Sequence, residues 1–277
     1  MPEAVIPEKL YGVIGHPLAQ TLSPLLHNWG FARLGINAAY LAFKTPPERL
    51  EAFIRAVRTL PIAGVSITIP HKEAVMLLLD GISDAAGRAF AVNTLVWEDG
   101  RLVGHNTDIT GFVAPLLERR EPLSRKRALV LGAGGAAKAV LAGLEQLDIA
   151  DVVVANRALE RAEKLAAQFG VRAVPWEERV LTPADLVVNA TPMGMKGKAE
   201  DESPLPPGYW KPGHVAYDLI YNPRTTLFLR QAREANAQTI DGLTMFAAQG
   251  AAQFKLWTGR DLPLDEARSL LARALYA

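Results

Sequence analysis

The most informative segment of this chain is Ala128-Leu-Val-Leu-Gly132-Ala-Gly134-Gly135-Ala136-Ala137-Lys138-Ala-Val. A short apolar run meets a glycine cluster, which opens directly into an alanine-rich helical pattern. Strand, glycine turn and helix in this order are the context that a dinucleotide-binding G-x-G-x-x-A fingerprint requires. Gly132 permits the tight turn, Gly134 lets the backbone approach a pyrophosphate, and Ala137 keeps helix and strand close. A glycine turn without a ligand would be the default interpretation of a bare G-x-G, but the strand before it and the helix after it, whose N-terminal N–H groups suit an anion, favour cofactor binding.

The residues after the next strand indicate which dinucleotide would bind. The strand predicted over residues 151–155 ends in Asn156-Arg157, and Arg161 follows one helical turn later. An NAD enzyme would carry Asp or Glu at this place to hold the ribose hydroxyl, whereas a guanidinium suits the 2′-phosphate of NADP. Both arginines could instead belong to a solvated helix face. We place them in the first turn of that helix, where the helix dipole disfavours cations. The sequence therefore favours NADP over NAD.

The composition narrows the class of protein. The chain has 277 residues, 49% hydrophobic and 21% charged, and this length accommodates two domains of ordinary size. A net charge of +1 gives no reason to expect nucleic acid or a membrane surface as a partner. No cysteine is present, which is compatible with the cytoplasm, and the five scattered histidines predict no metal site. The N-terminal residues do not resemble a signal peptide, and no apolar run is long enough to span a bilayer.

Strand and helix patterns alternate along the chain, which predicts an α/β fold with parallel sheets. In the first part we expect strands over residues 10–14, 39–43 and 64–69, helices over 24–34 and 48–57, and a hairpin over 94–103 that turns at Asp99-Gly100. A helix over 110–118 leads into the dinucleotide unit, with further strands over 151–155, 186–189 and 215–218. The final helices, about 243–257 and 264–275, follow a unit that already looks complete. We therefore expect a first domain over 1–109, a Rossmann-type domain over 110–242, and residues 243–277 packing back onto the first domain.

Four polar segments lie at strand ends in the first domain, where open α/β sheets bind ligands. They are Gly15–Pro24, Ser66–Lys72, Ala91–Thr94 and Gly104–Gly111. Structural interpretations also exist: Ser23 could be an N-cap before Pro24, and Asp108 could cap the helix that follows it. A lone lysine such as Lys72 usually faces solvent.

These segments resemble the motifs of shikimate dehydrogenases. The family's S-x-S-P, N-V-T-x-P-x-K, A-V-N-T and N-T-D-x-x-G motifs appear in order as Thr21-Leu-Ser23-Pro24, Ser66-Ile-Thr68-Ile-Pro-His-Lys72, Ala91-Val-Asn93-Thr94 and Asn106-Thr-Asp108-Ile-Thr-Gly111. The resemblance continues through Gly132–Ala136, Asn156-Arg157 and Asn189-Ala-Thr191-Pro to Tyr221-Asn-Pro, Asp241–Met245 and Gln249–Gly259. It therefore covers essentially the whole chain.

The resemblance implies an N-terminal α/β substrate domain, a Rossmann-type NADP-binding domain and a cleft between them. It implies NADPH-dependent reduction of 3-dehydroshikimate to shikimate, a step of the shikimate pathway toward chorismate and the aromatic amino acids. Lys72 and Asp108 would form the catalytic pair and also contact the substrate. Thr21 and Ser23 would hold the substrate carboxylate, and Thr68, Asn93, Tyr221 and Gln249 would hold ring hydroxyls or the carboxylate. The residues that would line NADP are Gly132, Ala133, Gly134, Gly135, Ala136, Asn156, Arg157, Arg161, Thr191, Ile220, Gly242 and Met245. The sequence leaves open whether the chain forms a homodimer.

Three positions depart from the family pattern. Thr21 stands for the first serine, Ser66 for the usual asparagine, and Ala158 for the threonine that commonly follows Asn-Arg. Thr21 adds a methyl group beside the carboxylate-bearing carbon, where quinate carries an extra hydroxyl. Ala158 removes one possible phosphate contact, which leaves NAD use open.

Other functions remain as alternatives. One is a quinate/shikimate dehydrogenase with relaxed substrate or NAD use. A second is a non-catalytic sensor that binds a nucleotide and a metabolite, against which the presence of both Lys72 and Asp108 argues. A third is a purely structural two-domain protein, in which the polar strand ends would have no purpose.

Overall fold

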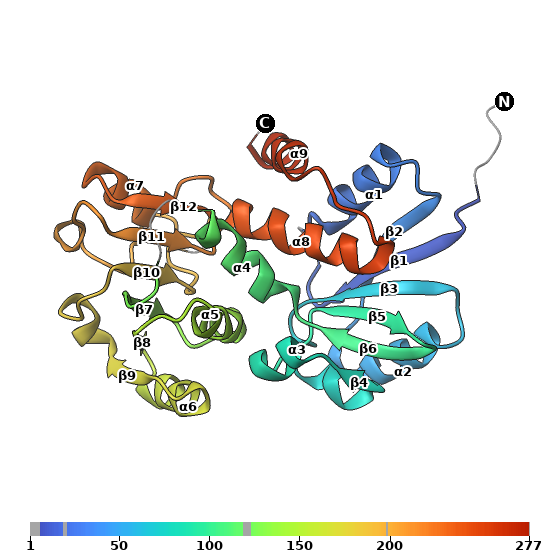
Figure 1. Cartoon of the computed structure of the whole chain (residues 1–277), viewed down its shortest axis with the longest axis horizontal. Coiled ribbons are helices and arrows are strands. Elements are labelled where there is room, and N and C mark those ends of the chain that lie inside the picture. The colour runs from blue at the N-terminus through green and yellow to red at the C-terminus, as the bar shows by residue number, and fades with distance from the viewer. Residues whose placement is uncertain (1–5, 19–20, 119–122, 198, 277) are drawn as a thin grey trace. The chain divides into compact units, whose positions relative to one another are not determined.

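The computed structural model of the chain describes residues 6–18, 21–118, 123–197 and 199–276. They belong to two compact units (Figure 1): unit 1 comprises residues 1–107 and 249–271, and unit 2 comprises residues 108–248 and 272–277. Two long helices, α8 (Gly242–Thr258) and α9 (Leu264–Tyr276), each have one end in unit 1 and the other end in unit 2.

Unit 1 is built on a six-stranded sheet in the order β2-β1-β3-β5-β6-β4. Its strands are β1 (Lys9–Gly15), β2 (Ala38–Lys44), β3 (Ile62–Ile67), β4 (Gly81–Ile82), β5 (Thr94–Glu98) and β6 (Arg101–His105). β1 pairs in parallel with β2 and β3, but β5 runs antiparallel to both β3 and β6. The expectation of a parallel sheet is therefore wrong here. The predicted hairpin accounts for the antiparallel pairing of β5 with β6: Asp99 and Gly100 both have positive φ, 49° and 77°, as a two-residue hairpin turn requires.

One face of this sheet packs against α2 (Leu50–Val57), which follows a short 3-10 turn, η1 (Pro47–Arg49). Leu50, Ile54 and Val57 recur at helical spacing and join a buried cluster with strand residues such as Val65 and Leu95. Two further elements lie beside it, η2 (Ala74–Leu78) and α3 (Asp84–Ala89). We had not predicted α3 or the two-residue strand β4, because neither is long enough to show apolar periodicity.

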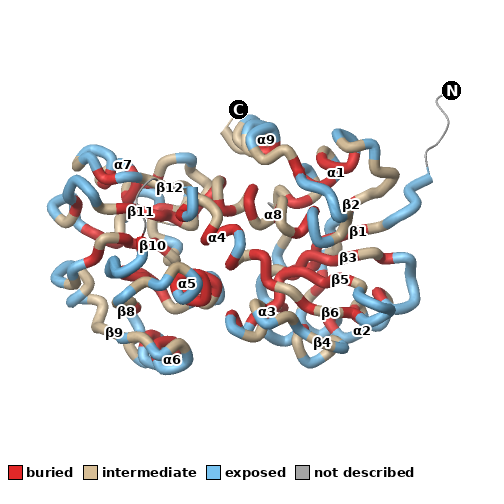
Figure 2. Tube along the Cα trace, in the orientation of Figure 1, coloured by how far each residue is buried: buried red, intermediate tan, exposed pale blue. Residues whose placement is uncertain are grey.

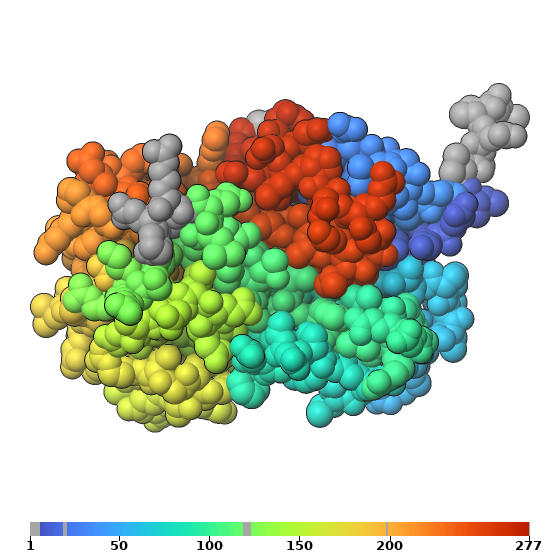
Figure 3. All heavy atoms as spheres, in the orientation of Figure 1, coloured from blue at the N-terminus to red at the C-terminus, as the bar shows by residue number. Residues whose placement is uncertain are grey.

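The other face packs against α1 (Ser23–Arg33) and the unit 1 part of α8. Their contact is aromatic: the Phe31 ring lies 5.2 Å from the Tyr11 ring and 5.4 Å from the Phe254 ring. Gly30 allows α1 to approach α8 closely, since a Cβ at this position would lie 2.8 Å from Phe254 Cε2 and 2.6 Å from Leu262 Cδ1. Figure 3 shows the red atoms from the end of the chain directly against the blue atoms of the N-terminal part of unit 1. Residues more than 200 positions apart thus complete one core.

Unit 2 is built on a six-stranded sheet that is parallel throughout. Its strands are β7 (Arg127–Leu131), β8 (Asp151–Asn156), β9 (Arg172–Pro175), β10 (Leu186–Asn189), β11 (Val215–Asp218) and β12 (Gln238–Ile240). The order β12-β11-β10-β7-β8-β9 is the doubly wound order of dinucleotide-binding domains. The sequence does not predict β9 (RAVP) and β12 (QTI), because neither is a continuous apolar run; β10 and β11, with four residues each, are fully buried.

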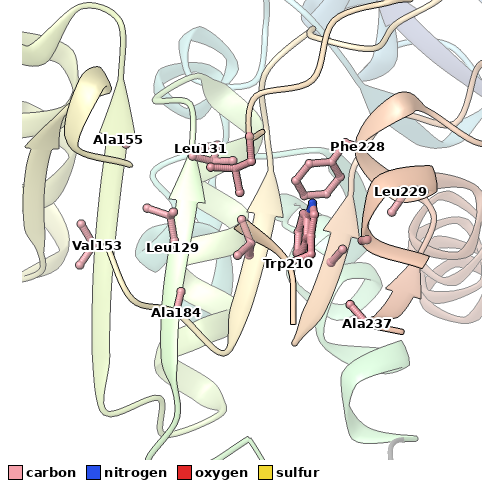
Figure 4. Packing of buried hydrophobic residues seen from close by; sticks show 13 residues of the cluster. Leu129, Leu131, Val153, Ala155, Ala184, Trp210, Phe228, Leu229 and Ala237 are labelled. Carbon is pink, nitrogen blue, oxygen red and sulfur yellow. The ribbon is translucent and has the colours of Figure 1, made fainter. Parts of the chain in front are cut away.

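Helices cover both faces of this sheet. They are α4 (Thr107–Leu117), α5 (Gly135–Gln146), α6 (Leu159–Phe169) and α7 (Leu227–Glu234), with 3-10 turns η3 (Trp176–Val180) and η4 (Pro207–Tyr209). On one face the Phe112 ring of α4 stacks on Tyr217, with centroids 5.0 Å apart. On the other face Leu131 and Phe228 belong to one buried cluster, in which Trp210 meets Phe228 edge to face at 5.0 Å (Figure 4). The central strands of both sheets are largely buried (Figure 2).

Within the described ranges, no helix has both the length and the apolar character that crossing a bilayer would require.

One histidine is part of the core of unit 1. The His27 ring is fully buried, stacks on Tyr40 with centroids 4.5 Å apart, and lies 5.0 Å from the Trp257 ring. Its Nε2 meets Gln253 Oε1 at 3.3 Å. Burial lowers the pKa of His27 to about 3, although the Gln253 contact acts in the opposite direction. His27 is therefore neutral in the folded protein over the whole physiological range.

This burial predicts an acid sensitivity. The pKa of His27 is about 3 in the folded state and 6.5 as the reference value for the unfolded chain. The unfolded chain then binds the extra proton, so stability is fully present above pH 6.5 and is lost as the pH falls toward 3. Between pH 6.5 and 4.5 the loss from this group should be about 2 kcal/mol. The free energy of unfolding can be measured by urea titration at several pH values. The loss caused by His27 should be absent in His27→Phe and present in the exposed control His16→Gln. Parallel curves for His27→Phe and the wild type would contradict the assignment.

Candidate active site

The glycine turn lies where the strand order of unit 2 reverses, between β7 and β10. Gly132 directly follows β7 and has a φ of +107°. A Cβ at this position would lie 2.9 Å from the backbone oxygen of Ala190, which follows β10. Glycine is therefore required here by both the backbone conformation and the neighbouring loop. In open α/β sheets, the point of reversal is the usual ligand-binding crevice.

The next two glycines have a different reason to be present. Gly134 is the N-cap of α5 and Gly135 its first residue; both are exposed. A Cβ on either would have no protein atom within 4 Å. Protein packing thus does not require glycine at these positions, whereas close approach of a ligand to the backbone would. Ala137, which we expected to keep the helix close to the strand, is fully buried.

The two arginines lie just after β8. α6 begins at Leu159 with Ala158 as its N-cap, so only Arg161 lies in the first helical turn, and Arg157 precedes the helix. The expectation that both lie in the first turn is wrong for Arg157, because Asn156 Nδ2 donates to Ala158 O at 2.9 Å and holds the chain in a bend there. Both arginines are exposed, and neither forms an ion pair with any described residue.

A buried carboxylate connects two loops at the same edge of the sheet. Asp218, at the end of β11, accepts hydrogen bonds from Asn189 Nδ2 (3.0 Å), Ile220 N (3.1 Å) and Thr226 Oγ1 (2.6 Å). Burial raises the pKa of Asp218 to about 7, with these hydrogen bonds opposing the shift. Asn189 Oδ1 in turn accepts from Thr191 N and Oγ1, at 3.0 and 2.7 Å. The predicted site residues Thr191 and Ile220 are thus attached to one buried group.

The start of α8 packs against the loop after β11. A Cβ on Gly242 would lie 2.4 Å from Leu219 O, so only glycine allows the helix to begin here. Met245, one turn later, is buried. The Tyr221 ring lies 5.5 Å from Phe246, its backbone carbonyl accepts the Tyr276 hydroxyl, and burial raises the pKa of its phenol.

In unit 1, three segments with predicted site residues meet at one edge of the sheet. β1 and β3 end there and the antiparallel β5 begins there, with Ile14 opposite Ile67 and Ser66 opposite Thr94. The backbone of Thr68 donates to Ile14 O at 3.0 Å, and Ile67 N donates to Asn93 O at 2.8 Å. These bonds place the polar loops after β1, after β3 and before β5 side by side.

The loop after β1 differs in one respect from expectation. α1 begins at Ser23 with Leu22 at the N-cap position and no side-chain cap, so the prediction that Ser23 caps this helix is wrong. The buried Ser23 side chain instead hydrogen-bonds the Tyr40 phenol, and its N–H donates to Thr21 Oγ1 at 3.4 Å. The Thr21 side chain is half-buried.

Lys72 and Asn93 are held close together by the backbone. Lys72 is half-buried, and its carbonyl accepts the Val92 N–H at 2.8 Å. Asn93 is buried, and its Oδ1 accepts from Thr107 N at 2.8 Å. Asn93 therefore supplies an acceptor to the first residue of α4, and Asp108 follows as the second residue of that helix. Asp108 does not begin the helix, as a cap would.

Most predicted substrate residues belong to unit 1: Thr21, Ser23, Thr68, Lys72, Asn93 and Gln249. Asp108, Tyr221 and all predicted cofactor residues belong to unit 2. In the part of the chain that the structure describes, no group of three or more His, Cys, Asp or Glu is placed to hold a metal ion.

Two buried polar residues behind these positions, Gln253 and Asp218, were not predicted from the sequence. Gln253, one helical turn after Gln249, bonds to Ser66 and Thr94, and Asp218 joins the loops of unit 2. The spacing of four residues between the two glutamines, which places them on one helix face, was the available signal.

Three family models match the chain. The shikimate dehydrogenase substrate binding domain matches residues 13–95. The shikimate / quinate 5-dehydrogenase model matches residues 116–195, and the shikimate 5′-dehydrogenase C-terminal domain matches residues 242–271.

Individual proteins match over nearly their whole length. A shikimate dehydrogenase (NADP+) of Oleidesulfovibrio alaskensis is 53% identical, over 98% of this chain and 97% of that protein. A Thermus thermophilus shikimate 5-dehydrogenase, solved with NADP(H) and shikimate, is 41% identical with a TM-score of 0.87, over 96% and 99% of the two chains. A Corynebacterium glutamicum quinate dehydrogenase, solved with NAD, is 31% identical with a TM-score of 0.89, over 95% and 98%. The chain belongs to the shikimate dehydrogenase family.

Proposed function

We propose that this chain catalyses the reversible NADPH-dependent reduction of 3-dehydroshikimate to shikimate, a step toward chorismate and the aromatic amino acids. The observation that carries the proposal is the polar sheet edge of unit 1, where Thr68, Lys72 and Asn93 are held side by side by backbone hydrogen bonds. The relative that is 53% identical is named for this activity. A spectrophotometric screen of shikimate and quinate against NADP and NAD tests it, with shikimate and NADP expected to give the highest kcat/KM.

Substrate binding is assigned to unit 1 and dinucleotide binding to unit 2. The structure fits an NADP molecule in two respects: Gly134 and Gly135 leave open space at a helix N-terminus, and Arg157 and Arg161 are exposed near the end of β8. The cofactor residues would be Gly132, Ala133, Gly134, Gly135, Ala136, Asn156, Arg157, Arg161, Thr191, Ile220, Gly242 and Met245. When bound, the reduced nicotinamide supplies the hydride for the carbonyl carbon.

Lys72 stabilises and neutralises the negative charge that this reaction creates on the substrate oxygen. Hydride addition turns the carbonyl oxygen into an alkoxide, which needs stabilisation and a proton. The Lys72 ammonium donates a hydrogen bond to that oxygen and then the proton. Desolvation would favour the neutral amine, and the carboxylate of Asp108 opposes this effect when it lies near the ammonium.

The remaining polar residues recognise the substrate. Thr21 and Ser23 hold the carboxylate, and Thr68, Asn93, Tyr221 and Gln249 hold the ring hydroxyls or the carboxylate. A substrate with several hydroxyls needs several polar partners, because each buried hydroxyl without one costs roughly 1–3 kcal/mol.

Quinate oxidation is the second candidate. Thr21 adds a methyl group where the family has serine, and the chain is similar to a quinate dehydrogenase over 95% of its length. Discrimination between the two substrates would then depend on the space next to the carboxylate-bearing carbon.

A cytoplasmic location and a homodimer stay predictions. The absence of cysteine is compatible with the cytoplasm. Analytical ultracentrifugation would measure the oligomeric state, and fractionation of the source cells would measure the location.

Replacing Lys72 tests the mechanism. In Lys72→Ala, kcat should fall by roughly 100-fold or more, since both the proton and the charge that stabilises the alkoxide are lost. Shikimate affinity should change much less. The control is Lys255→Ala, which removes only an exposed pair with Asp261 and should leave kcat unchanged. A kcat of Lys72→Ala within a fewfold of wild type would rule out its role as the proton donor.

Replacing Thr21 tests the carboxylate site. Thr21→Ser keeps the hydroxyl, so shikimate should be turned over with little change in kcat/KM. If Thr21 admits quinate, the ratio of kcat/KM for quinate to that for shikimate should change. An unchanged ratio would place the discrimination at other residues.

Replacing Arg157 tests the choice of cofactor. A guanidinium and a 2′-phosphate form charge-assisted hydrogen bonds worth about 1.5–3 kcal/mol. In Arg157→Ala, KM for NADP should rise by roughly one to two orders of magnitude, and KM for NAD should barely change. Arg161→Ala should show a smaller effect in the same direction, and the exposed control Arg233→Ala should show none. Equal losses for both cofactors would mean that Arg157 supports the fold or the adenine site instead.

A further inference from the structure

A buried glutamine joins two sets of hydrogen bonds in unit 1. Gln253 lies on α8, one helical turn after Gln249, and its side chain is 2% exposed. Its Oε1 accepts a hydrogen bond from Ser66 Oγ at 3.0 Å, and the Ser66 hydroxyl itself accepts from the Tyr40 phenol at 2.6 Å. The Ser66 proton is therefore directed at Gln253.

The amide nitrogen of Gln253 faces the loop before β5. Its Nε2 donates to the carbonyl oxygen of Asn93 at 3.1 Å and to Thr94 Oγ1 at 2.9 Å. A carbonyl oxygen can only accept, so the nitrogen and not the oxygen of the glutamine must lie on this side. Both ends of the Gln253 amide thus have a defined orientation.

The orientation of the Gln253 amide also affects the side chain of Asn93, through Thr94. Because Thr94 Oγ1 accepts from Gln253, its own proton is directed to another acceptor, and Asn93 Oδ1 lies 2.8 Å away. Asn93 Oδ1 also accepts the Thr107 N–H. The Asn93 oxygen therefore accepts from Thr94 Oγ1 and from the Thr107 N–H, and its nitrogen, turned away from the Thr94 hydroxyl, donates to Thr107 Oγ1 at 3.0 Å.

We propose that Gln253 is a positioning residue for substrate binding: through Thr94 it sets the orientation of the Asn93 amide that contacts the substrate. The inference rests on the proposed function, since it needs Asn93 to bind a ring hydroxyl. Ser66 stands where the family usually has asparagine. It belongs to the same network, because its hydroxyl accepts a hydrogen bond from Tyr40 and donates one to Gln253.

Replacement of the amide by a carboxyl group gives a direct test. In Gln253→Glu, an ionised carboxylate would face the Asn93 carbonyl oxygen and would attract the Thr94 proton, which releases Asn93 Oδ1. A protonated carboxyl could still donate as the amide does. Substrate affinity in this variant should therefore depend on pH.

The neighbouring titratable groups do not obscure this readout. His27 on α1 contacts Gln253, and Tyr40 on β2 reaches it through Ser66. Lys72 and Asp108 adjoin Asn93 and Thr107, but both are present in the wild type and in the variant, so the comparison with wild type removes their contribution. Burial lowers the pKa of His27 to about 3 and raises the pKa of Tyr40. Neither changes its protonation between pH 6 and about 9, the range that suits the assay, so the introduced carboxyl would be the group of this network that titrates there.

The experiment measures KM for shikimate and for NADP between pH 6 and about 9 in the wild type, in Gln253→Glu and in the exposed control Gln168→Glu. Relative to wild type, KM for shikimate in Gln253→Glu should rise about tenfold with pH, as expected for loss of an aligned hydrogen bond. KM for NADP should stay within about twofold, and the control should follow the wild type. A general loss of structure would affect both KM values and would not follow the ionisation of one carboxyl.

Two variants of Thr94 provide an independent test in case Gln253→Glu does not fold. Thr94→Val removes the hydroxyl between Gln253 and Asn93 at nearly constant shape and should raise KM for shikimate about tenfold, whereas Thr94→Ser should restore it. A wild type that turns over shikimate, with Gln253→Glu and Thr94→Val both indistinguishable from it, would overturn the proposal. A wild type that does not turn over shikimate would instead contradict the proposed function.

Discussion

Buried polar groups must find hydrogen-bond partners inside the protein, and this requirement organises the ligand-facing edges of both sheets. In unit 1 the amide of Gln253 connects β3, the start of β5 and α8. In unit 2 the carboxylate of Asp218 connects the loops after β10 and β11. Each is buried behind residues proposed to contact ligand. Loops that carry binding residues are thereby held in one conformation.

The glycines of unit 2 show two separate constraints. Gly132 and Gly242 are required by the protein itself, because a Cβ would collide with the backbone of Ala190 or Leu219. Gly134 and Gly135 face open space at the N-terminus of α5. Gly132 brings the backbones after β7 and β10 together at the point where the sheet order reverses, and Gly242 lets α8 begin against the loop after β11. The second pair leaves the point of reversal accessible to a phosphate group.

Apolar strand runs and characteristic turn residues could be predicted from the sequence. They indicate the strands β1, β2, β3, β8, β10 and β11, the Asp99-Gly100 hairpin and the glycine turn. They do not indicate β4, β9 and β12, because the pairing of these strands is set by neighbouring strands rather than by their own residues. The antiparallel position of β5 beside β3 was missed for the same reason.

The dinucleotide fingerprint, the absence of an acidic residue after β8 and the order of the polar motifs can all be recognised without a structure, since they depend on residues adjacent in the chain. The residues that support them are identified only in the folded chain. His27, Tyr40, Ser66 and Gln253 are far apart in sequence, and each has an ordinary structural interpretation when read alone. Their roles follow from burial, because a polar side chain removed from water must be paired with whichever partner the folded chain places beside it.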